Sequence, residues 1–227
     1  MPPRQRIRCF ECGYEFNLTG RMHSTYCPKC RTTLDLAGYT IDSDCAEPLK
    51  TLGTVVVTKR GIVNSTRIVA NDIELHGKIK KSPSQAFGAL IVHPGAEFAR
   101  KDIDASDLRL AEGAEIAFKA PATYRDVEVA GKLECELYAT GVVTIRAGGV
   151  FEGTIHARHL VVEDGGILLG EMNISDEGLD VARKKREEFR EGPPSELEKE
   201  KIKVPALPEP EEEEEPPAAP PRQQPGS

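Results

Sequence analysis

The feature that most constrains this chain is a repeat that runs from residue 52 to residue 174. Each copy places an apolar residue, a small residue two positions later, and then two alternating apolar residues, most clearly from Ile68, Ile103 and Ile155. Self-similarity at a fixed period predicts a solenoid, in which each repeat is one coil that buries its apolar face against its neighbours. With the weaker copies included, the repeat has eight starts about 17 residues apart on average: Leu52, Ile68, Phe87, Ile103, Phe118, Leu137, Ile155 and Met172.

Within each repeat the apolar residues alternate with a period of two, as in Val127-Glu128-Val129, which predicts strands rather than helices. Turn-forming pairs such as Asn71-Asp72 and Pro94-Gly95 separate the short runs. Three short strands fit one coil, so we predict an all-β fold with a three-sided parallel β-helix over residues 52–174. The small residues expected where the faces meet are Ala70, Ala89, Ala105, Ala120, Ala139 and Ala157.

Four cysteines near the start of the chain have the spacing of a zinc site. Cys9 and Cys12 form one CxxC pair, Cys27 and Cys30 form another, and 14 residues separate the pairs. Each pair is typical of a zinc knuckle, although Arg31 stands where a glycine is expected. Four protein ligands close the coordination shell, so the sequence predicts one structural zinc ion in a ribbon over residues 1–35.

The ribbon carries little information about its partner. Residues 1–31 hold six basic and two acidic side chains, but four thiolates and a zinc ion cancel half of this positive charge. The aromatic residues of the ribbon are expected to form its core rather than to stack on bases. Docking to another protein, or a purely structural role, is therefore favoured over nucleic-acid binding, which stays open. The aromatic residues in question are Phe10, Tyr14, Phe16 and Tyr26.

Residues 36–51 are too polar to pack alone, so we expect them to form a linker that leaves ribbon and β-helix as separate modules. Cys45 has no partner at ligand spacing, whereas Cys135 lies at an alternating position expected in the core. No nucleophile motif or phosphate-binding loop is found, which argues against an enzyme. The histidines of the β-helix are expected to be solvated surface residues: His76, His93, His156 and His159.

The end of the chain has a different composition. Residues 175–191 are charged and could form a short exposed helix. Residues 192–227 contain ten prolines and carry nine acidic against four basic side chains, which predicts a disordered acidic tail. The first residues lack the apolar run of a signal peptide, and no 18-residue apolar stretch occurs. We therefore expect a cytoplasmic protein without a transmembrane segment.

The glycine and valine pattern of the last coils resembles that of the bactofilins. It is clearest in residues 148–157, 160–166 and 170–174. The resemblance implies a right-handed parallel β-helix flanked by disordered ends, in a bacterial cytoskeletal protein that forms polymers. Residues 80–98 and 117–126 depart from the family pattern, so we expect irregular coils there. The ribbon stands in place of the short apolar stretch by which some members attach to membranes.

The sequence therefore predicts a non-catalytic scaffold that assembles end to end into filaments, because a β-helix without caps exposes a strand edge at each end. Two other classes stay open. One is a hexapeptide-repeat enzyme, whose coils of 18 residues are more regular than these spacings of 15 to 19. The other is a nucleic-acid-binding ribbon on a β-helical platform. The residues expected at the polymer interface are Leu52, Val55 and Val57 at one end and Leu168, Met172 and Ile174 at the other.

Overall fold

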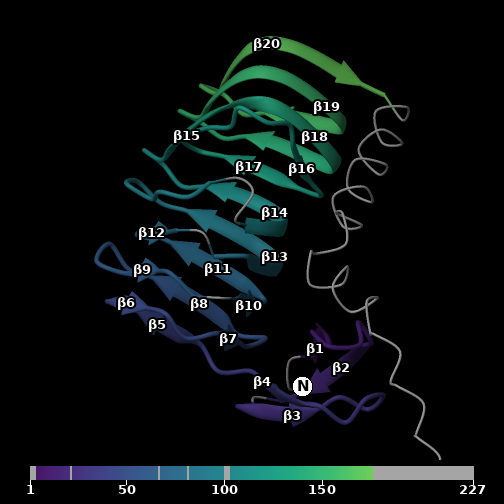
Figure 1. The fold of residues 1–227 in the computed structure, drawn as a ribbon. Coiled ribbons are helices and arrows are strands. Elements are labelled where there is room, and N and C mark those ends of the chain that lie inside the picture. The colour runs from purple at the N-terminus through teal and green to yellow at the C-terminus, as the bar shows by residue number, and fades with distance from the viewer. Residues whose placement is uncertain (1–3, 21, 66, 81, 100–102, 176–227) are drawn as a thin grey trace, which may run out of the picture. The chain divides into compact units, whose positions relative to one another are not determined.

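The computed structural model describes residues 4–20, 22–65, 67–80, 82–99 and 103–175. Every regular element in these ranges is a β-strand (Figure 1). Apart from Ser175, the charged segment predicted over 175–191 and the tail predicted over 192–227 lie outside the described residues.

Two antiparallel hairpins form the N-terminal ribbon. The first pairs β1 (Arg4–Arg8) with β2 (Glu15–Thr19), and the second pairs β3 (Ser24–Tyr26) with β4 (Thr33–Asp35). Each CxxC pair lies in or beside the loop between the two strands of a hairpin. The hairpins thus present the four cysteines from two similar turns.

The rest of the described chain is a parallel β-solenoid, which confirms the predicted fold class (Figure 1). Its first face stacks eight strand segments in parallel, one for each coil. They are β5 (Tyr39–Ile41), β8 (Thr54–Val57), β11 (Asp72–Leu75), the ends of β13 (Ser84–Val92) and β14 (Ile103–Leu110), β17 (Val127–Val129), and the ends of β18 (Lys132–Ile145) and β19 (Val150–Val162).

Two further faces complete the coils. The second face contains β7 (Leu49–Lys50), β10 (Ile68–Ala70), the starts of β13 and β14, β16 (Ala122–Tyr124), the middle of β18 and β19, and the end of β20 (Ile167–Ile174). The third contains β6 (Asp44–Cys45), β9 (Ile62–Val63), β12 (Lys78–Ile79), β15 (Glu115–Ala117) and the starts of β18, β19 and β20.

The parallel register aligns like side chains into columns that fill the interior. On the first face, alternate residues point inward, and the intervening ones point to solvent. One inward column is almost completely buried, with each member at most 1% exposed: Val57, Leu75, Val92, Leu110, Val129 and Ile145. The apolar period of two in the sequence is therefore the period of this core.

Small residues form a column on the second face, close to the corner with the first. Ala70 pairs with Ala86, Ala86 with Ala105, and Ala139 with Ala157. The prediction was right for four of its six alanines and wrong for Ala89 and Ala120. Ala89 pairs with Asp107 on the first face, and Ala120 is exposed. Ala86 occupies the position expected for Ala89, because an extra residue enters the coil just after it.

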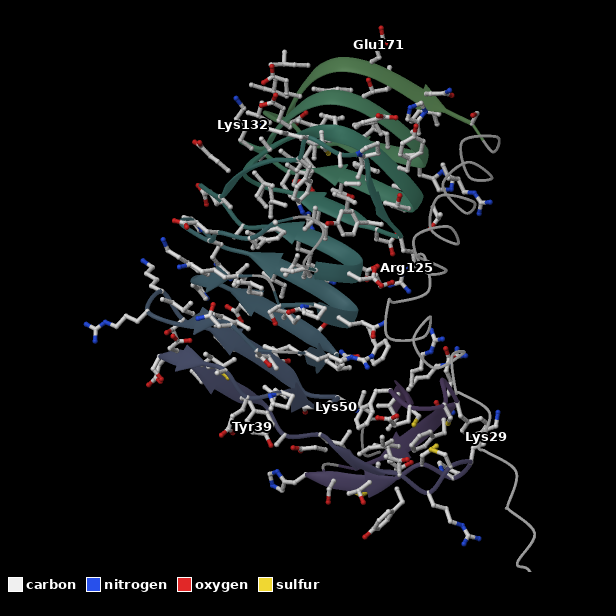
Figure 2. All side chains as sticks on the ribbon, viewed as in Figure 1. Lys29, Tyr39, Lys50, Arg125, Lys132 and Glu171 are labelled. Atoms are coloured by element: carbon white, nitrogen blue, oxygen red, sulfur yellow. The ribbon has the colours of Figure 1, made fainter. Side chains whose placement is uncertain are left out.

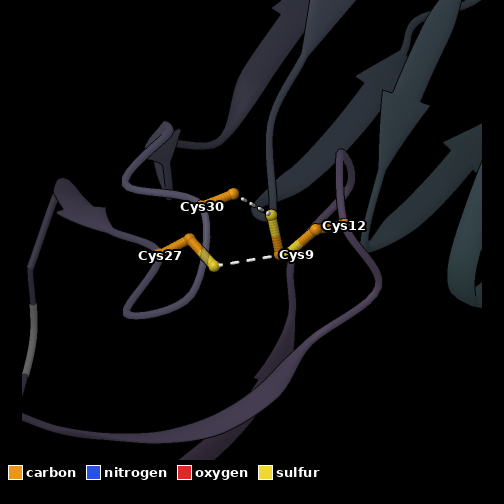
Figure 3. Close-up of side chains that lie close together, drawn as sticks. All are labelled: Cys9, Cys12, Cys27 and Cys30. Atoms are coloured by element: carbon orange, nitrogen blue, oxygen red, sulfur yellow. Dashed lines mark hydrogen bonds between the residues drawn. The ribbon is translucent and has the colours of Figure 1, made fainter.

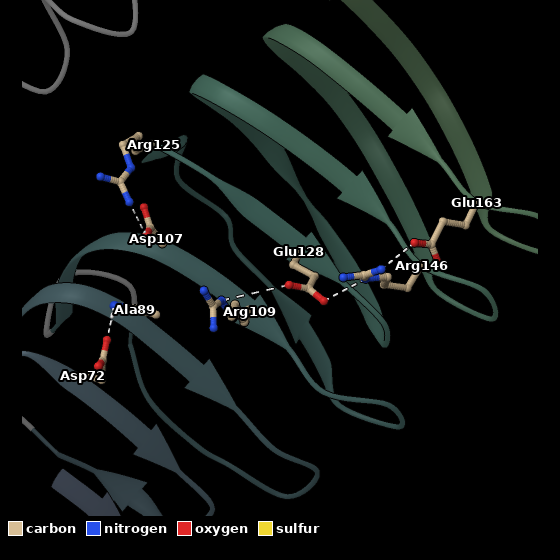
Figure 4. Close-up of polar contacts among 8 residues, drawn as sticks. All are labelled: Asp72, Ala89, Asp107, Arg109, Arg125, Glu128, Arg146 and Glu163. Carbon is tan, nitrogen blue, oxygen red and sulfur yellow. Dashed lines mark hydrogen bonds and ion pairs between the residues drawn. The ribbon is translucent and has the colours of Figure 1, made fainter. Parts of the chain in front are cut away.

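That extra residue makes a β-bulge at the same corner in two coils, and Figure 4 shows Asp72 and Ala89 at the first of them. The register shifts between Ala86 and Ala89 and again between Ala139 and Val142. In the coil before each bulge an aspartate accepts a backbone N–H of the bulged segment: Asp72 Oδ1 from Ala89 at 2.7 Å, and Asp126 Oδ1 from Val142 at 2.9 Å. The aspartate thus satisfies a donor that the bulge removes from the ladder.

The solenoid begins one coil earlier than predicted. The segment expected to be a linker, 36–51, instead contains β5, β6 and β7, which pair in parallel with β8, β9 and β10. Cys45 and Leu49 pack against the solenoid core as partly buried side chains. Short strands held by backbone hydrogen bonds leave little apolar pattern in the sequence. The irregularity expected over 80–98 is present as the β-bulge after Ala86, although β13 runs through it as one strand of nine residues.

The ribbon and the solenoid share an apolar cluster, which contradicts the expectation of separate modules. Leu52 and Phe87 of the solenoid pack with the buried residues of the ribbon. The Leu52 N–H donates to the Asp35 carbonyl oxygen at 2.7 Å, and Lys50 forms an ion pair with Glu11 at 2.7 Å. The stability of the first coil therefore depends on the ribbon.

Candidate metal centre and assembly surface

Matching backbone turns position the two CxxC pairs. In the first turn Cys9 N–H donates to Tyr14 O, and Gly13 N–H donates to Cys9 O. In the second turn Cys27 N–H donates to Thr32 O, and Arg31 N–H donates to Cys27 O. Gly13 has φ of 68° and Arg31 has φ of 61°, so Arg31 adopts the left-handed conformation that favours glycine.

The four sulfur atoms converge at one point between the hairpins (Figure 3). Cys9 Sγ lies 3.7 Å from Cys30 Sγ, Cys12 Sγ lies 3.6 Å from Cys27 Sγ, and all four lie within 4.8 Å of one another. A tetrahedral zinc ion with Zn–S bonds of about 2.3 Å requires S–S separations of about 3.8 Å. The cluster could therefore hold a metal ion of this kind with little rearrangement.

The pKa values of Cys30 and Cys12 shift in opposite directions. The hydroxyl and backbone N–H of Thr32 stabilise the Cys30 thiolate and lower the pKa of this thiol to about 6. At Cys12 the backbone near Tyr14 lowers the pKa, but desolvation and the neighbouring thiols outweigh it and raise the pKa to about 12. One thiolate thus opposes the formation of the next, and a divalent cation would relieve this repulsion.

The surroundings of the cluster favour a structural role. Cys9 and Cys27 are each 1% exposed and pack with Ile7, Leu18 and Leu34. Four thiolates at tetrahedral spacing leave no coordination position for water or substrate. A metal ion held here would link the two hairpins and stabilise the small apolar cluster around them.

The expectation that all four aromatic residues form the ribbon core is correct only in part. Phe10 and Phe16 pack against the buried cluster. Tyr14 is 43% exposed and Tyr26 is 69% exposed, and Met22, which lies between them in sequence, is also exposed. The ribbon therefore presents apolar and aromatic side chains to solvent.

At the opposite end of the stack the inward columns are uncovered, near Glu171 in Figure 2. Ile155 is fully buried, whereas its partner one coil later, Met172, is 63% exposed. Ala157 and its partner Ile174 are 1% and 46% exposed. Leu168, partner of the buried Phe151, is only partly buried. Among the described residues, no strand covers β20, so these side chains and a strand edge form a terminal apolar surface.

The other residues predicted at a polymer interface do not lie at an end. Leu52, Val55 and Val57 are at most 3% exposed. Tyr39 and Ile41 of the additional first coil pair with Val55 and Val57, and the ribbon cluster contains Leu52. The prediction for these three residues is wrong because residues 39–50 add a coil beyond them, where the sequence predicts a linker.

The structure also brings together four charged side chains that the sequence pattern did not single out. Arg109, Glu128, Arg146 and Glu163 alternate in charge along the first face, with nitrogen–oxygen separations of 4.0, 2.8 and 2.5 Å (Figure 4). Both glutamates hydrogen-bond the Arg146 guanidinium and raise its pKa. Their sequence signal is that charges of opposite sign recur one coil apart along the chain. Exposed pairs of this kind stabilise the fold only weakly.

The histidines are less exposed than expected. His76 and His93 stack with ring centroids 3.8 Å apart, and His156 stacks on Tyr138 at 4.5 Å. His76, His93 and His156 are each partly buried, whereas His159 is exposed as predicted. Their contacts arise because residues one coil apart in sequence are neighbours across the parallel stack. Cys135 is 6% exposed, which confirms its predicted place in the core.

Comparison with family models finds a match over residues 102–173, to the family described as "Bactofilin: Polymer-forming cytoskeletal". The chain contains a bactofilin domain. The matched region begins just before β14 and ends within β20, so it includes Leu168 and Met172 of the terminal apolar surface. The coils before it continue the same solenoid. Neither the curated proteins nor the solved structures give a match. Among the described residues, no helix is long and apolar enough to cross a membrane.

Proposed function

We propose that the protein is a non-catalytic cytoskeletal scaffold that polymerises end to end through its bactofilin solenoid. The observation that carries the proposal is the terminal apolar surface on β20, where buried columns end in Met172 and Ile174 at 63% and 46% exposure. An open strand edge beside exposed apolar side chains is a template for pairing with another chain. The family description, polymer-forming and cytoskeletal, supports the same conclusion.

The test introduces a charge on this surface. Met172→Arg places a cation among the inward columns, where a second subunit would have to desolvate it at a cost of several kcal/mol. We expect the variant to remain folded by circular dichroism and to fall from polymers to dimers or monomers in light scattering. Asn173→Arg is the matched control, because it adds a positive charge one residue away on the outward side of the same strand.

Two outcomes would contradict end-to-end assembly. One is a wild-type protein that stays monomeric at tens of micromolar. The other is equal loss of assembly in Met172→Arg and Asn173→Arg, which would indicate a lateral contact instead. A dimer in Met172→Arg alone would show that the opposite end still pairs.

We further propose that the ribbon holds one structural zinc ion and serves as a docking module for another protein. The sulfur separations of 3.6 and 3.7 Å support zinc, and the exposed Tyr14 and Tyr26 support docking. Exposed tyrosines also fit base stacking. A salt-dependent shift of labelled DNA or RNA would favour nucleic-acid binding, and its absence at low salt would remove that alternative.

We place this scaffold in the cytoplasm, because thiolate zinc ligands persist in a reducing compartment and the family is cytoskeletal. Its described residues offer no recognised arrangement of nucleophile and base. A structural role for the solenoid accounts for the buried columns, the row of alternating charges and the terminal apolar surface together.

A further inference from the structure

A second group of metal-ligating side chains lies on the solenoid. It consists of Glu74, His76 and His93, whose ligand atoms all lie within 4.8 Å of one another. Glu74 Oε1 is 3.0 Å from His76 Nε2 and 3.0 Å from His93 Nε2. Two imidazole nitrogens therefore face the same carboxylate oxygen.

The parallel register builds this arrangement from two successive coils. Leu75 pairs with Val92, so the residues that follow them, His76 and His93, occupy equivalent positions one coil apart. The His76 N–H donates to Val57 O at 2.8 Å, and the His93 N–H donates to Leu75 O at 2.9 Å. Hydrogen bonds between coils thus fix the backbone at both histidines. The two rings stack with centroids 3.8 Å apart and an interplanar angle of 13°.

Glu74 reaches both rings because it is the outward residue of β11, two positions before His76. The three side chains are between 25% and 32% exposed, which shields them in part but leaves a path to solvent. Among the described residues, no lysine or arginine forms an ion pair with Glu74. Within the described part of the chain, the carboxylate therefore has no lysine or arginine partner, and two protonated rings stacked at this distance would repel each other.

We propose that Glu74, His76 and His93 bind a divalent transition-metal ion at a site independent of the ribbon. Two imidazoles and one carboxylate are a common ligand set for zinc and suit copper, nickel and cobalt. Bonds of about 2.0–2.2 Å in a tetrahedron give ligand separations of about 3.3–3.6 Å. The two separations of 3.0 Å to the glutamate oxygen are slightly shorter than this range, so a small opening of the group would admit the ion. With three protein ligands, the fourth coordination position is open to solvent, unlike the closed set of four thiolates.

The test uses the full chain with its ribbon first loaded with one equivalent of zinc. Cobalt is then titrated and followed by calorimetry and visible absorption. We expect one further equivalent to bind without the intense sulfur-to-cobalt charge-transfer band that displacement of ribbon zinc would produce. Removing a ligand in His93→Gln or Glu74→Gln should weaken this second binding by at least about 10-fold, the lower range seen when even supporting groups around a metal are lost.

The matched control is His156→Gln, which also removes a stacked, partly buried histidine on the solenoid surface. This control should keep the second equivalent at wild-type affinity. Zinc retained by the ribbon and an unchanged circular dichroism spectrum show that each variant is folded. The proposal is overturned if the wild type binds no second equivalent at millimolar cobalt, or if His93→Gln and Glu74→Gln bind it as the wild type does. Equal loss in His156→Gln would also overturn it. None of these outcomes depends on polymerisation, so they leave the proposed function untouched.

Discussion

At the scale of single residues, Arg31 has a backbone conformation that suits another residue. Its φ of 61° matches that of Gly13 at the equivalent position of the other turn. A left-handed conformation costs a non-glycine residue roughly 1–2 kcal/mol of stability. Glycine avoids this cost, but its more flexible unfolded state lowers the stability by about 0.4–1 kcal/mol. We therefore expect Arg31→Gly to stabilise the ribbon by roughly 0.5–1 kcal/mol, measured as a higher zinc-dependent unfolding midpoint. Lys29→Gly, at a position without positive φ, is the control and should be neutral or destabilising; a higher midpoint there too would refute the explanation.

At the scale of elements, the bulges depend on a glycine facing an aspartate of the preceding coil. A Cβ atom on Gly141 would lie 2.1 Å from Asp126 Oδ1 and 2.9 Å from Arg125 O. Gly141→Ala should therefore lower the free energy of unfolding by about 1–3 kcal/mol, as overpacking does. Asp126→Ala removes the atom nearest to the new methyl group. The double variant should therefore lose less unfolding free energy than the sum of the losses in the two single variants. Gly38→Ala is the control, because its nearest contact would be 3.4 Å. Strict additivity in urea unfolding would show that the clash is not what destabilises Gly141→Ala.

At the scale of the whole molecule, the shared cluster couples the ribbon to the solenoid. Replacing Cys12 and Cys30 with serine should abolish binding of the ribbon metal and unfold the ribbon. Because Leu52 and Phe87 pack against the ribbon, hydrogen exchange should also accelerate in the first coil, residues 39–50, and much less in residues 143–162. The same pattern should follow when a chelator removes the metal. Unchanged exchange in residues 39–50 would mean that the ribbon contributes nothing to the first coil.

The repeat predicted the architecture, but it did not place every copy at the correct position within its coil. Ile68, Ile103 and Ile155 lie at paired positions of the second face, as their sequence copies require. The weaker copies at Phe87 and Phe118 were misplaced: Ser84 pairs with Ile68, and Ala122 pairs with Leu137. A search for large apolar residues misses an inward position that is filled by serine or alanine. The cysteine spacing sufficed for the ribbon site, whereas the Glu74 group needed the register between coils to become visible.

The position of the ribbon gives any end-to-end polymer a measurable period. Eight strand segments stack on the first face, and a rise of about 4.8 Å for each gives a subunit length of about 38 Å. If every subunit points the same way, ribbons recur along the filament about every 38 Å. If subunits alternate, joined through like ends, ribbons occur in pairs about every 77 Å. Labels on the ribbon would thus report filament polarity as a single spacing in electron micrographs.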